Sequence, residues 1–251
     1  MANSPSGDSV TERIVRILET FSADRTLQTV ADIGRRSGLP SSTAHRQVEA
    51  LVEAGLLERD DDARVRLGMR LWELALRGSA ALRLRQAAMP FMERVQAAIR
   101  EHTQLAVLEQ DEALFLERLS SPDSGANITR IAGRLPLHAS SSGLVLLAYG
   151  GVELQERVLT GPLARLAPET ITDAAALRRT LADVRRRGFV VAPGSIEAVS
   201  TGVAVPIRDA SGEVIAALSV VLPREAPTAA ALEELQAAAA GIRSALAADR
   251  R

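Results

Sequence analysis

The chain has 251 residues, enough for one large domain or two ordinary ones, and its 47% hydrophobic and 24% charged residues are typical of a folded globular protein. It contains no cysteine, which excludes disulfides, thiolate metal sites and cysteine nucleophiles. All thirty basic residues are arginine, which excludes Schiff-base chemistry and phosphate loops that need a lysine. Because the net charge is −1, any argument for nucleic-acid binding has to rest on local surface.

The sequence contains no signal for export or for a membrane. The first ten residues hold neither a basic segment nor an apolar run, and no apolar stretch approaches the ~20 residues that span a bilayer. The lack of cysteine suits a reducing compartment. We therefore expect a cytoplasmic protein.

The N-terminal part begins with three predicted helices. Apolar residues over 10–22 recur at the spacing of one face of an amphipathic helix. A short helix over 29–36 follows, with Thr29 as its cap. A third helix begins at Ser41 and ends at Gly55.

Two short strands are predicted next, at 56–59 and 64–67, around the polar turn 60–63. Two helices joined by a Ser-Gly-Leu-Pro turn and followed by a β-hairpin are typical of a winged helix-turn-helix. The second helix of such a pair enters the major groove of DNA. We therefore predict a DNA-binding head.

The third helix has an apolar and a polar side. If Ala44, Val48 and Leu51 are buried, the opposite side faces DNA. Hydroxyls near a helix start can donate to phosphate oxygens, while histidine and arginine can reach base edges. The alternative is that these residues are only a helix cap and solvated arginines. The candidate DNA contacts are Ser41, Ser42, Thr43, His45 and Arg46 on this helix, with Arg64 and Arg66 on the second wing strand.

The charge of the head argues partly against DNA binding. Residues 1–68 hold nine arginines against eleven acids, and the acidic turn at 60–62 would repel a phosphate. Between Ile33 and Val48, however, there are three arginines and no acid. Local surface matters more than the total, because charges are screened beyond ~10 Å.

A connecting helix is predicted over 69–88, since Leu71, Leu74, Gly78 and Leu82 recur at spacings of three or four. We expect this helix to pack against its counterpart in a homodimer; the alternative is packing within the chain. Pro90 marks the start of a further helix whose inner side extends toward His102.

Beyond this point the chain alternates short apolar runs with helical segments. A turn at 209–212 joins two of the runs, which predicts an antiparallel hairpin. The pattern predicts an α+β domain with a mainly antiparallel sheet. Strands are predicted at 104–109, 113–119, 188–192, 202–208 and 213–222, and helices at 142–149, 173–187 and 228–248.

Three blocks of the sequence resemble the IclR-type bacterial transcriptional regulators. They are LQTVADIGRRSGLPSSTAHRQVEALVEAGLLERDDDARVRLGMRLWELA at 27–75, RLPLHASSSGLVLLA at 134–148, and RGFVVAPGSIEAVSTGVAVPIRDASGEVIAALSVVLP at 187–223.

The resemblance implies a winged helix-turn-helix over 1–68, a linker helix over 69–88 that helps the heads dimerise, and a GAF-like effector-binding and oligomerisation domain over 89–251. Many members of this family assemble as dimers of dimers. The implied partners are double-stranded operator DNA, a small-molecule effector and a second copy of the chain.

The chain departs from the family at three positions. Ser41 stands where relatives often carry a lysine, which weakens a phosphate anchor. Gly202 stands where relatives often carry a cysteine, and we expect the missing side chain to enlarge the pocket. Ala192 stands where a relative has an acidic residue, so the effector is expected to differ.

The segment 138–143 precedes a predicted helix, so its hydroxyls and free backbone N–H groups converge where the helix dipole favours an anion. The alternative is a serine-rich helix cap without a ligand. Arg130 and Arg134 could pair with a carboxylate or simply be exposed. The candidate effector residues are Ser140, Ser141 and Ser142 from this segment and, by resemblance, Ala192, Ser200, Gly202 and Ser219, with Val221 as a neighbour.

These observations favour a DNA-binding transcriptional regulator whose operator affinity is controlled by an organic acid or aromatic effector. We expect no catalytic residue, cofactor or metal site. One alternative is an enzyme acting on a small acid, but its only nucleophile–base pair would be Ser140 with His138, two positions apart. The other alternative is a dimerisation module that does not bind DNA.

Overall fold

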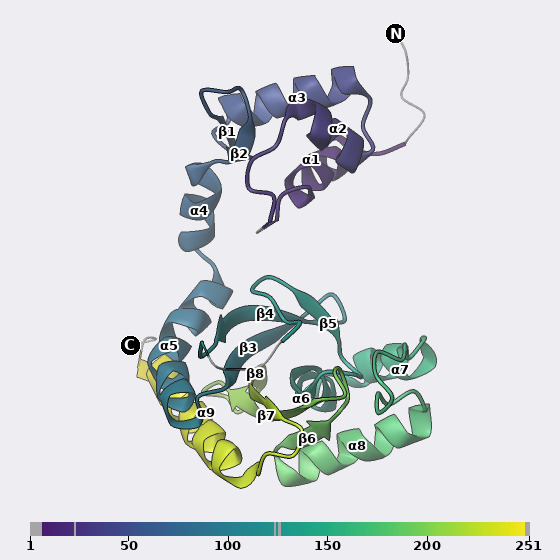
Figure 1. Cartoon of the computed structure of the whole chain (residues 1–251), viewed down its shortest axis with the longest axis vertical. Helices are drawn as coiled ribbons and strands as arrows, with labels where there is room; N and C mark the ends of the chain where they lie inside the picture. Colours follow the sequence, from purple (N-terminus) through teal and green to yellow (C-terminus); the bar gives the residue numbers. More distant parts are fainter. Residues whose placement is uncertain (1–6, 23, 123, 125–126, 249–251) are drawn as a thin grey trace. The chain divides into compact units, whose positions relative to one another are not determined.

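A computed structural model describes residues 7–22, 24–122, 124 and 127–248 (Figure 1). The chain divides into two compact units, residues 1–82 and 83–251. Each unit has its own hydrophobic core.

The first unit has the helix-turn-helix and wing that the sequence predicts. The helical stripes meet in a core where Ile17, Ile33, Ala44 and Val48 are fully buried, which confirms the inner side of the third helix. Gly38, at φ 66°, provides the left-handed turn between the second and third helices. The elements are α1 (Val10–Glu19), α2 (Val30–Ser37), α3 (Ser41–Glu53), β1 (Leu57–Arg59), β2 (Val65–Leu67) and α4 (Met69–Leu76).

The wing is anchored to the helices by the segment before α2. Strands β1 and β2 pair antiparallel, and Val65 of β2 also exchanges two backbone hydrogen bonds with Gln28, of 3.0 and 2.7 Å. The Gln28 side chain is buried and donates to the hydroxyl of Thr20. Strand β2 is therefore hydrogen-bonded on both of its edges near the core.

The second unit is a six-stranded sheet between two layers of helices (Figure 1). The strand order is β5-β4-β3-β8-β7-β6, and every neighbouring pair is antiparallel, as the sequence predicts. The predicted hairpin is present, with Gly212 at φ 93° in its turn. The strands are β3 (His102–Glu109), β4 (Glu112–Leu119), β5 (Arg134–Pro136), β6 (Val190–Pro193), β7 (Ser200–Arg208) and β8 (Val214–Pro223).

The two faces of the sheet bury different helices. Leucine, valine and isoleucine side chains from β3, β7 and β8 pack against α5 and α9 on one face. On the other face the central strands present Ala106, Ala204 and Ala217, against which α6 packs. The helices are α5 (Ala80–Ile99), α6 (Ser141–Tyr149), α7 (Val152–Thr160), α8 (Ala174–Arg187) and α9 (Ala229–Ala248).

Helix α6 is the most deeply buried helix, with eight of its nine residues inside. The small alanine side chains of the sheet allow its backbone to come close. Gly143 is part of the same fit, because a Cβ there would lie 2.7 Å from the Cα and the carbonyl oxygen of Leu137.

Several predicted elements differ from the structure. The single helix over 69–88 is wrong: α4 ends at Leu76 and α5 begins at Ala80. Pro90 lies inside α5 and does not start a helix, because the buried residues around it, Ala88 and Met92, pack on the sheet and offset one lost backbone hydrogen bond. His102 belongs to β3 and not to the preceding helix. Short β5 and helix α7 were not predicted.

The close packing at Gly143 makes a testable prediction. We expect Gly143→Ala to lower the free energy of unfolding by about 1–3 kcal/mol, since the new methyl group meets backbone that cannot rotate away. The matched control is Gly151→Ala, where a Cβ meets nothing within 4 Å. Urea unfolding followed by circular dichroism measures both. Equal stability of the two variants would contradict the packing argument.

Candidate nucleic-acid interface and ligand pocket

Four of the five candidate DNA contacts on α3 lie on one exposed side. Ser41, Ser42, His45 and Arg46 are exposed, whereas Thr43 is only 8% exposed and faces the core of the head. Among the described residues, Arg46 has no hydrogen-bond or ion-pair partner, so its guanidinium group is available to a ligand. The exposed side of α3 thus combines two hydroxyls, an imidazole and one unpaired cation.

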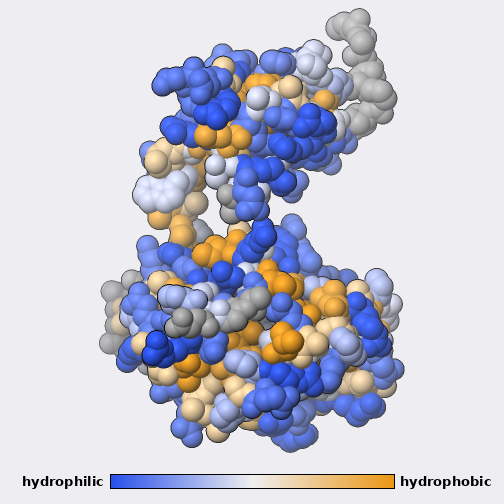
Figure 2. Space-filling view, in the orientation of Figure 1, coloured by the Kyte–Doolittle hydropathy of each residue, from blue (hydrophilic) through white to orange (hydrophobic). Residues whose placement is uncertain are grey.

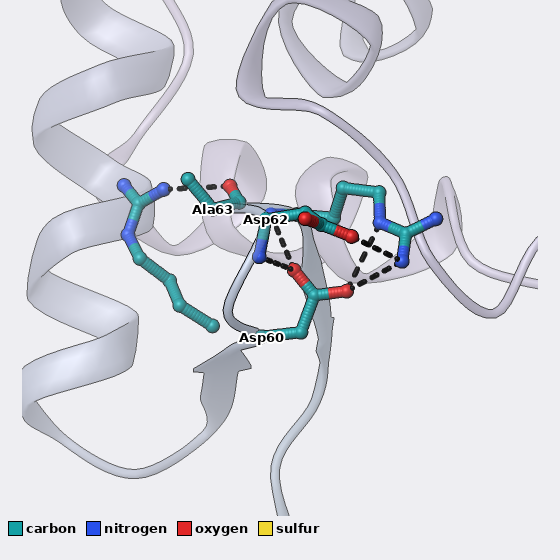
Figure 3. Close-up of polar contacts among 5 residues, drawn as sticks. Asp60, Asp62 and Ala63 are labelled. Carbon is teal, nitrogen blue, oxygen red and sulfur yellow. Dashed lines mark hydrogen bonds and ion pairs between the residues drawn. The ribbon is translucent and has the colours of Figure 1, made fainter.

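The wing arginine Arg64 is paired within the wing itself. Its guanidinium group contacts the carboxylates of Asp60, at 2.9 Å, and Asp62, at 3.2 Å (Figure 3). Asp60 also accepts the backbone N–H groups of Arg64 and Asp62 and so closes the turn. Burial raises the pKa of Asp60, but the hydrogen bonds from Arg64 outweigh it and hold that pKa below its usual value.

The other arginines of the head are mostly paired as well. Arg66 contacts Glu58 at 3.1 Å, and Glu58 accepts the backbone N–H of Met69 at the start of α4. The hydrogen bond from Met69 has the largest effect on the pKa of Glu58, and together with that from Arg66 it lowers this pKa below its usual value. On α2, Arg35 pairs with Asp32, and Arg36 donates to the side chain of Gln28. Carboxylates of the head therefore hold Arg35, Arg64 and Arg66, whereas Arg36 is bonded to a neutral amide.

The second unit contains a small pocket beside the N-terminus of α6. The volume that the centre of a water molecule can reach inside it is ≈ 40 Å³. Its lining consists of Gln104, Phe115, Asn127, Ile128, Thr129, Leu135, Ala139, Ser140, Ser141, Ser142, Ala192, Ser195, Ile196, Glu197, Ser200, Gly202 and Val221.

The structure brings six of the seven candidate effector residues into this lining. The seventh, Ser219, is fully buried behind it and shares a 2.9 Å hydrogen bond with the hydroxyl of Ser142. Val221, the expected neighbour, also lines the pocket. These residues come from the start of α6 and from β6, β7 and β8, and the structure brings them to one pocket.

The N-terminus of α6 presents free backbone donors to the pocket. Ser140 is the cap, and its hydroxyl accepts the N–H of Gly143 at 3.0 Å. For the N–H groups of Ser141 and Ser142 the described chain offers no acceptor. These N–H groups, at the positive end of the helix dipole, make this corner of the pocket favourable for an anion.

The expectation that Gly202 enlarges the pocket is wrong. A Cβ at this position would lie 2.5 Å from the hydroxyl oxygen of Ser141 and 2.9 Å from its Cβ. The side chain of Ser141 already fills the space over the glycine. Gly202 is therefore a point where β7 approaches the N-terminus of α6 closely.

Sequence reasoning missed the lining residues on β3 and on the segment before β5. Gln104, a polar residue in an apolar strand and only 2% exposed, was a signal that could have been used. Asn127, Ile128 and Thr129 lie in an irregular segment, for which periodicity makes no prediction.

The remaining polar candidates have structural partners. His138 is buried, and its Nε2 lies 2.9 Å from the carbonyl oxygen of Ala164. Arg134 donates to the carbonyl of Glu109, and Arg130 is exposed. Within the described ranges there is no group of three His, Cys, Asp or Glu residues that could hold a metal ion. None of the helices described is long and apolar enough to cross a membrane.

Comparisons with known proteins agree with both halves of this structure. The IclR helix-turn-helix domain matches residues 10–61, and the domain described as bacterial transcriptional regulator IclR C-terminal matches residues 79–245. The chain is 30% identical over 211 residues to the HTH-type transcriptional regulator XynR of Escherichia coli (strain K12), covering 83% of this chain and 84% of the relative. It is 28% identical to the Pca regulon regulatory protein of Pseudomonas putida, covering 83% and 72%.

Among solved structures, one similar protein is an IclR homolog from Microbacterium hydrocarbonoxydans complexed with 4-hydroxybenzoate. It is 62% identical, with a TM-score of 0.92, and the match covers 96% of this chain and 100% of that chain. The family consists of regulators and not of enzymes. The chain belongs to the IclR family of bacterial transcriptional regulators, with a DNA-binding helix-turn-helix domain and a C-terminal effector domain.

Proposed function

We propose that this regulator binds a small aromatic acid of the 4-hydroxybenzoate type and that the acid controls its affinity for operator DNA. The observation that carries the proposal is the pocket beside α6 in a chain 62% identical to a homolog complexed with 4-hydroxybenzoate. In this proposal residues 1–68 are the DNA-binding head, 69–88 the linker, and 89–251 the effector-binding and oligomerisation part.

The chemistry of the pocket supports a ligand with one negative charge and a ring. Two free backbone N–H groups at the start of α6 suit a carboxylate. Among the described lining residues Glu197 alone is ionisable, so no guanidinium group is available for a second anionic group. Phe115, Leu135 and Val221 supply apolar contacts for a ring.

The size of the pocket adds a requirement. The volume that the centre of a water molecule can reach is only ≈ 40 Å³, and we propose that the lining opens further when a ring enters. A ligand that binds only the opened form shifts the population toward it, which is the energetic basis for a change at the DNA-binding head.

For DNA, we propose that Ser41 and Ser42 contact phosphates and that His45 and Arg46 reach base edges. Their exposure on one side of α3 supports these roles, while the burial of Thr43 leaves it out. Arg64 and Arg66 on the wing contribute less, because each is already paired with wing carboxylates.

The first prediction for the proposed function compares Arg46→Ala with Arg64→Ala. Loss of a bidentate contact to guanine should weaken binding to an operator, selected from random duplexes, by about 1–3 kcal/mol for Arg46→Ala, with little change on random DNA. Arg64→Ala should weaken binding to both DNAs slightly and to the same extent. Fluorescence anisotropy measures the four affinities, with Arg178→Ala, on the exposed surface of α8, as the control. Equal losses for Arg46→Ala on both DNAs would contradict base reading.

We propose further that α4 forms part of a homodimer interface. None of its residues is buried within the described chain. Met69, Trp72 and Leu76 are 60%, 61% and 40% exposed, and their spacing places them on one side of the helix. Figure 2 shows hydrophobic surface in the region of α4 labelled in Figure 1. Pairing of two heads doubles the DNA contacts.

The second prediction uses the only tryptophan of the chain. If α4 packs against its counterpart, Trp72 leaves water on association, so its emission should shift to shorter wavelength as concentration rises. Leu76→Glu should move this transition to higher concentration. Val199→Glu, at a residue 75% exposed on the second unit, is the matched control. Sedimentation that shows a monomer at micromolar concentration would refute the interface.

The third prediction tests the effector. At 100 times its dissociation constant, 4-hydroxybenzoate should stabilise the protein by about 2.7 kcal/mol, seen as a raised melting temperature, and should change operator affinity. Gly202→Ala should weaken this binding at least tenfold, because the added methyl group displaces Ser141 from the helix start. Gly151→Ala should bind like the wild type. Unchanged binding by a folded Gly202→Ala variant would show that the ligand binds elsewhere.

A further inference from the structure

Asn127, in the irregular segment beside the pocket, has an amide group that is only half satisfied. Its Oδ1 accepts two hydrogen bonds, from the backbone N–H of Thr129 at 2.9 Å and from the hydroxyl of Thr129 at 2.7 Å. Its Nδ2 is buried and has no hydrogen-bond partner within the part of the chain that the structure describes. A buried donor without an acceptor destabilises the ligand-free protein.

The orientation of this amide is determined by its neighbours. The backbone N–H of Thr129 can only donate, so the atom of Asn127 that faces it has to be the oxygen. The hydroxyl of Thr129 accepts from Nε2 of Gln104 at 2.6 Å, so its single proton is free to point at Asn127. A flipped Asn127 amide would place N–H against N–H. Nδ2 is therefore held as the unpaired end.

The hydrogen bonds continue from Thr129 to the N-terminus of α6. Gln104 uses Nε2 on Thr129, and its Oε1 accepts from the hydroxyl of Ser219 at 3.4 Å. Since the proton of Ser219 points at Gln104, the 2.9 Å contact between Ser219 and Ser142 requires Ser142 to donate. One chain of donors thus leads from α6 to the segment before β5, in the order Ser142, Ser219, Gln104, Thr129 and Asn127.

The middle members of this series of hydrogen bonds are buried away from water. Ser142, Ser219 and Gln104 are 1%, 0% and 2% exposed, and Thr129 is 6% exposed. A buried network in which every proton has one direction resists rearrangement, because reversing one member leaves a neighbour unsatisfied. Within it Ser142 has committed its hydroxyl proton, and Asn127 is the member whose side-chain nitrogen has no hydrogen-bond partner in the described part of the chain. Both residues line the pocket.

We infer that Nδ2 of Asn127 donates a hydrogen bond to an oxygen of the effector, which makes Asn127 a specificity-determining residue of this pocket. The inference rests on the proposed function. It adds that the ligand has to present an acceptor to Asn127 besides binding the N–H groups of α6. That acceptor is either a carboxylate oxygen or the oxygen of a ring hydroxyl.

The test uses Asn127→Asp and Asn127→Ala. Aspartate keeps an oxygen for Thr129 and replaces the donor by an acceptor, while alanine removes the donor without adding charge. The control is Ser124→Ala, which changes a hydroxyl of the same segment that bonds Ser121 and lies outside the pocket. Calorimetric titration with 4-hydroxybenzoate, benzoate and phenol measures binding, and melting curves confirm folding.

We expect both Asn127 variants to bind 4-hydroxybenzoate at least tenfold more weakly than the wild type and the control. An equal loss for benzoate assigns the donor to the carboxylate, whereas a loss for phenol with benzoate unchanged assigns it to the ring hydroxyl. Wild-type affinity in both variants overturns this inference and leaves the proposed function standing. A wild type that binds none of the three compounds overturns both.

A second measurement does not depend on variants that bind weakly. In the wild type, the side-chain amide protons of Asn127, identified by the loss of their NMR signal in Asn127→Asp, should move downfield when 4-hydroxybenzoate saturates the protein. Backbone signals of α6 should move with them. Movement of the α6 signals without any change at the Asn127 amide would also overturn the inference.

Discussion

The effector domain depends on the burial of α6 against the sheet. A helix can come this close only because the strands beneath it carry alanine and because Gly143 and Gly202 lack a side chain where the helix meets Leu137 and β7. Helix α6 begins inside the protein, so the free N–H groups of its first turn face the pocket and not bulk water. In this low-dielectric setting they attract an anion more strongly than they would at the surface.

The DNA-binding head solves a different electrostatic problem. The head has more acidic residues than arginines, although its ligand, DNA, is a polyanion. Most of its arginines are also paired with its own carboxylates. The wing is an example, since Asp60 both closes the turn and binds Arg64 (Figure 3). What remains is the exposed side of α3; in the proposed interface its few contacts would make specificity rest on shape and on individual bonds more than on total charge.

In the second unit the sheet lies between the pocket and α5, and its strands connect the two. Gln104 lies on β3, whose neighbour β4 carries the buried Glu117, and Glu117 pairs with Arg85 of α5 at 2.7 Å. Helix α5 begins in the first unit at Ala80 and packs on the sheet face opposite α6. In the proposed mechanism, a shift of β3 or β4 on effector binding would reach α5 through this ion pair, and the linkage would be reciprocal because a coupling free energy belongs to both sites.

The sequence by itself determined the elements whose period is long and regular. The three helices of the head, the wing, the hairpin of β7 and β8 and the serine-rich start of α6 were predicted because apolar spacing, caps and turn residues are local signals. Only the tertiary structure decided that Pro90 lies within a helix, that Ser141 fills the space over Gly202, and that wing arginines are paired. It also brought Asn127 to the pocket, since contacts between residues far apart in the chain depend on packing, which no local pattern encodes.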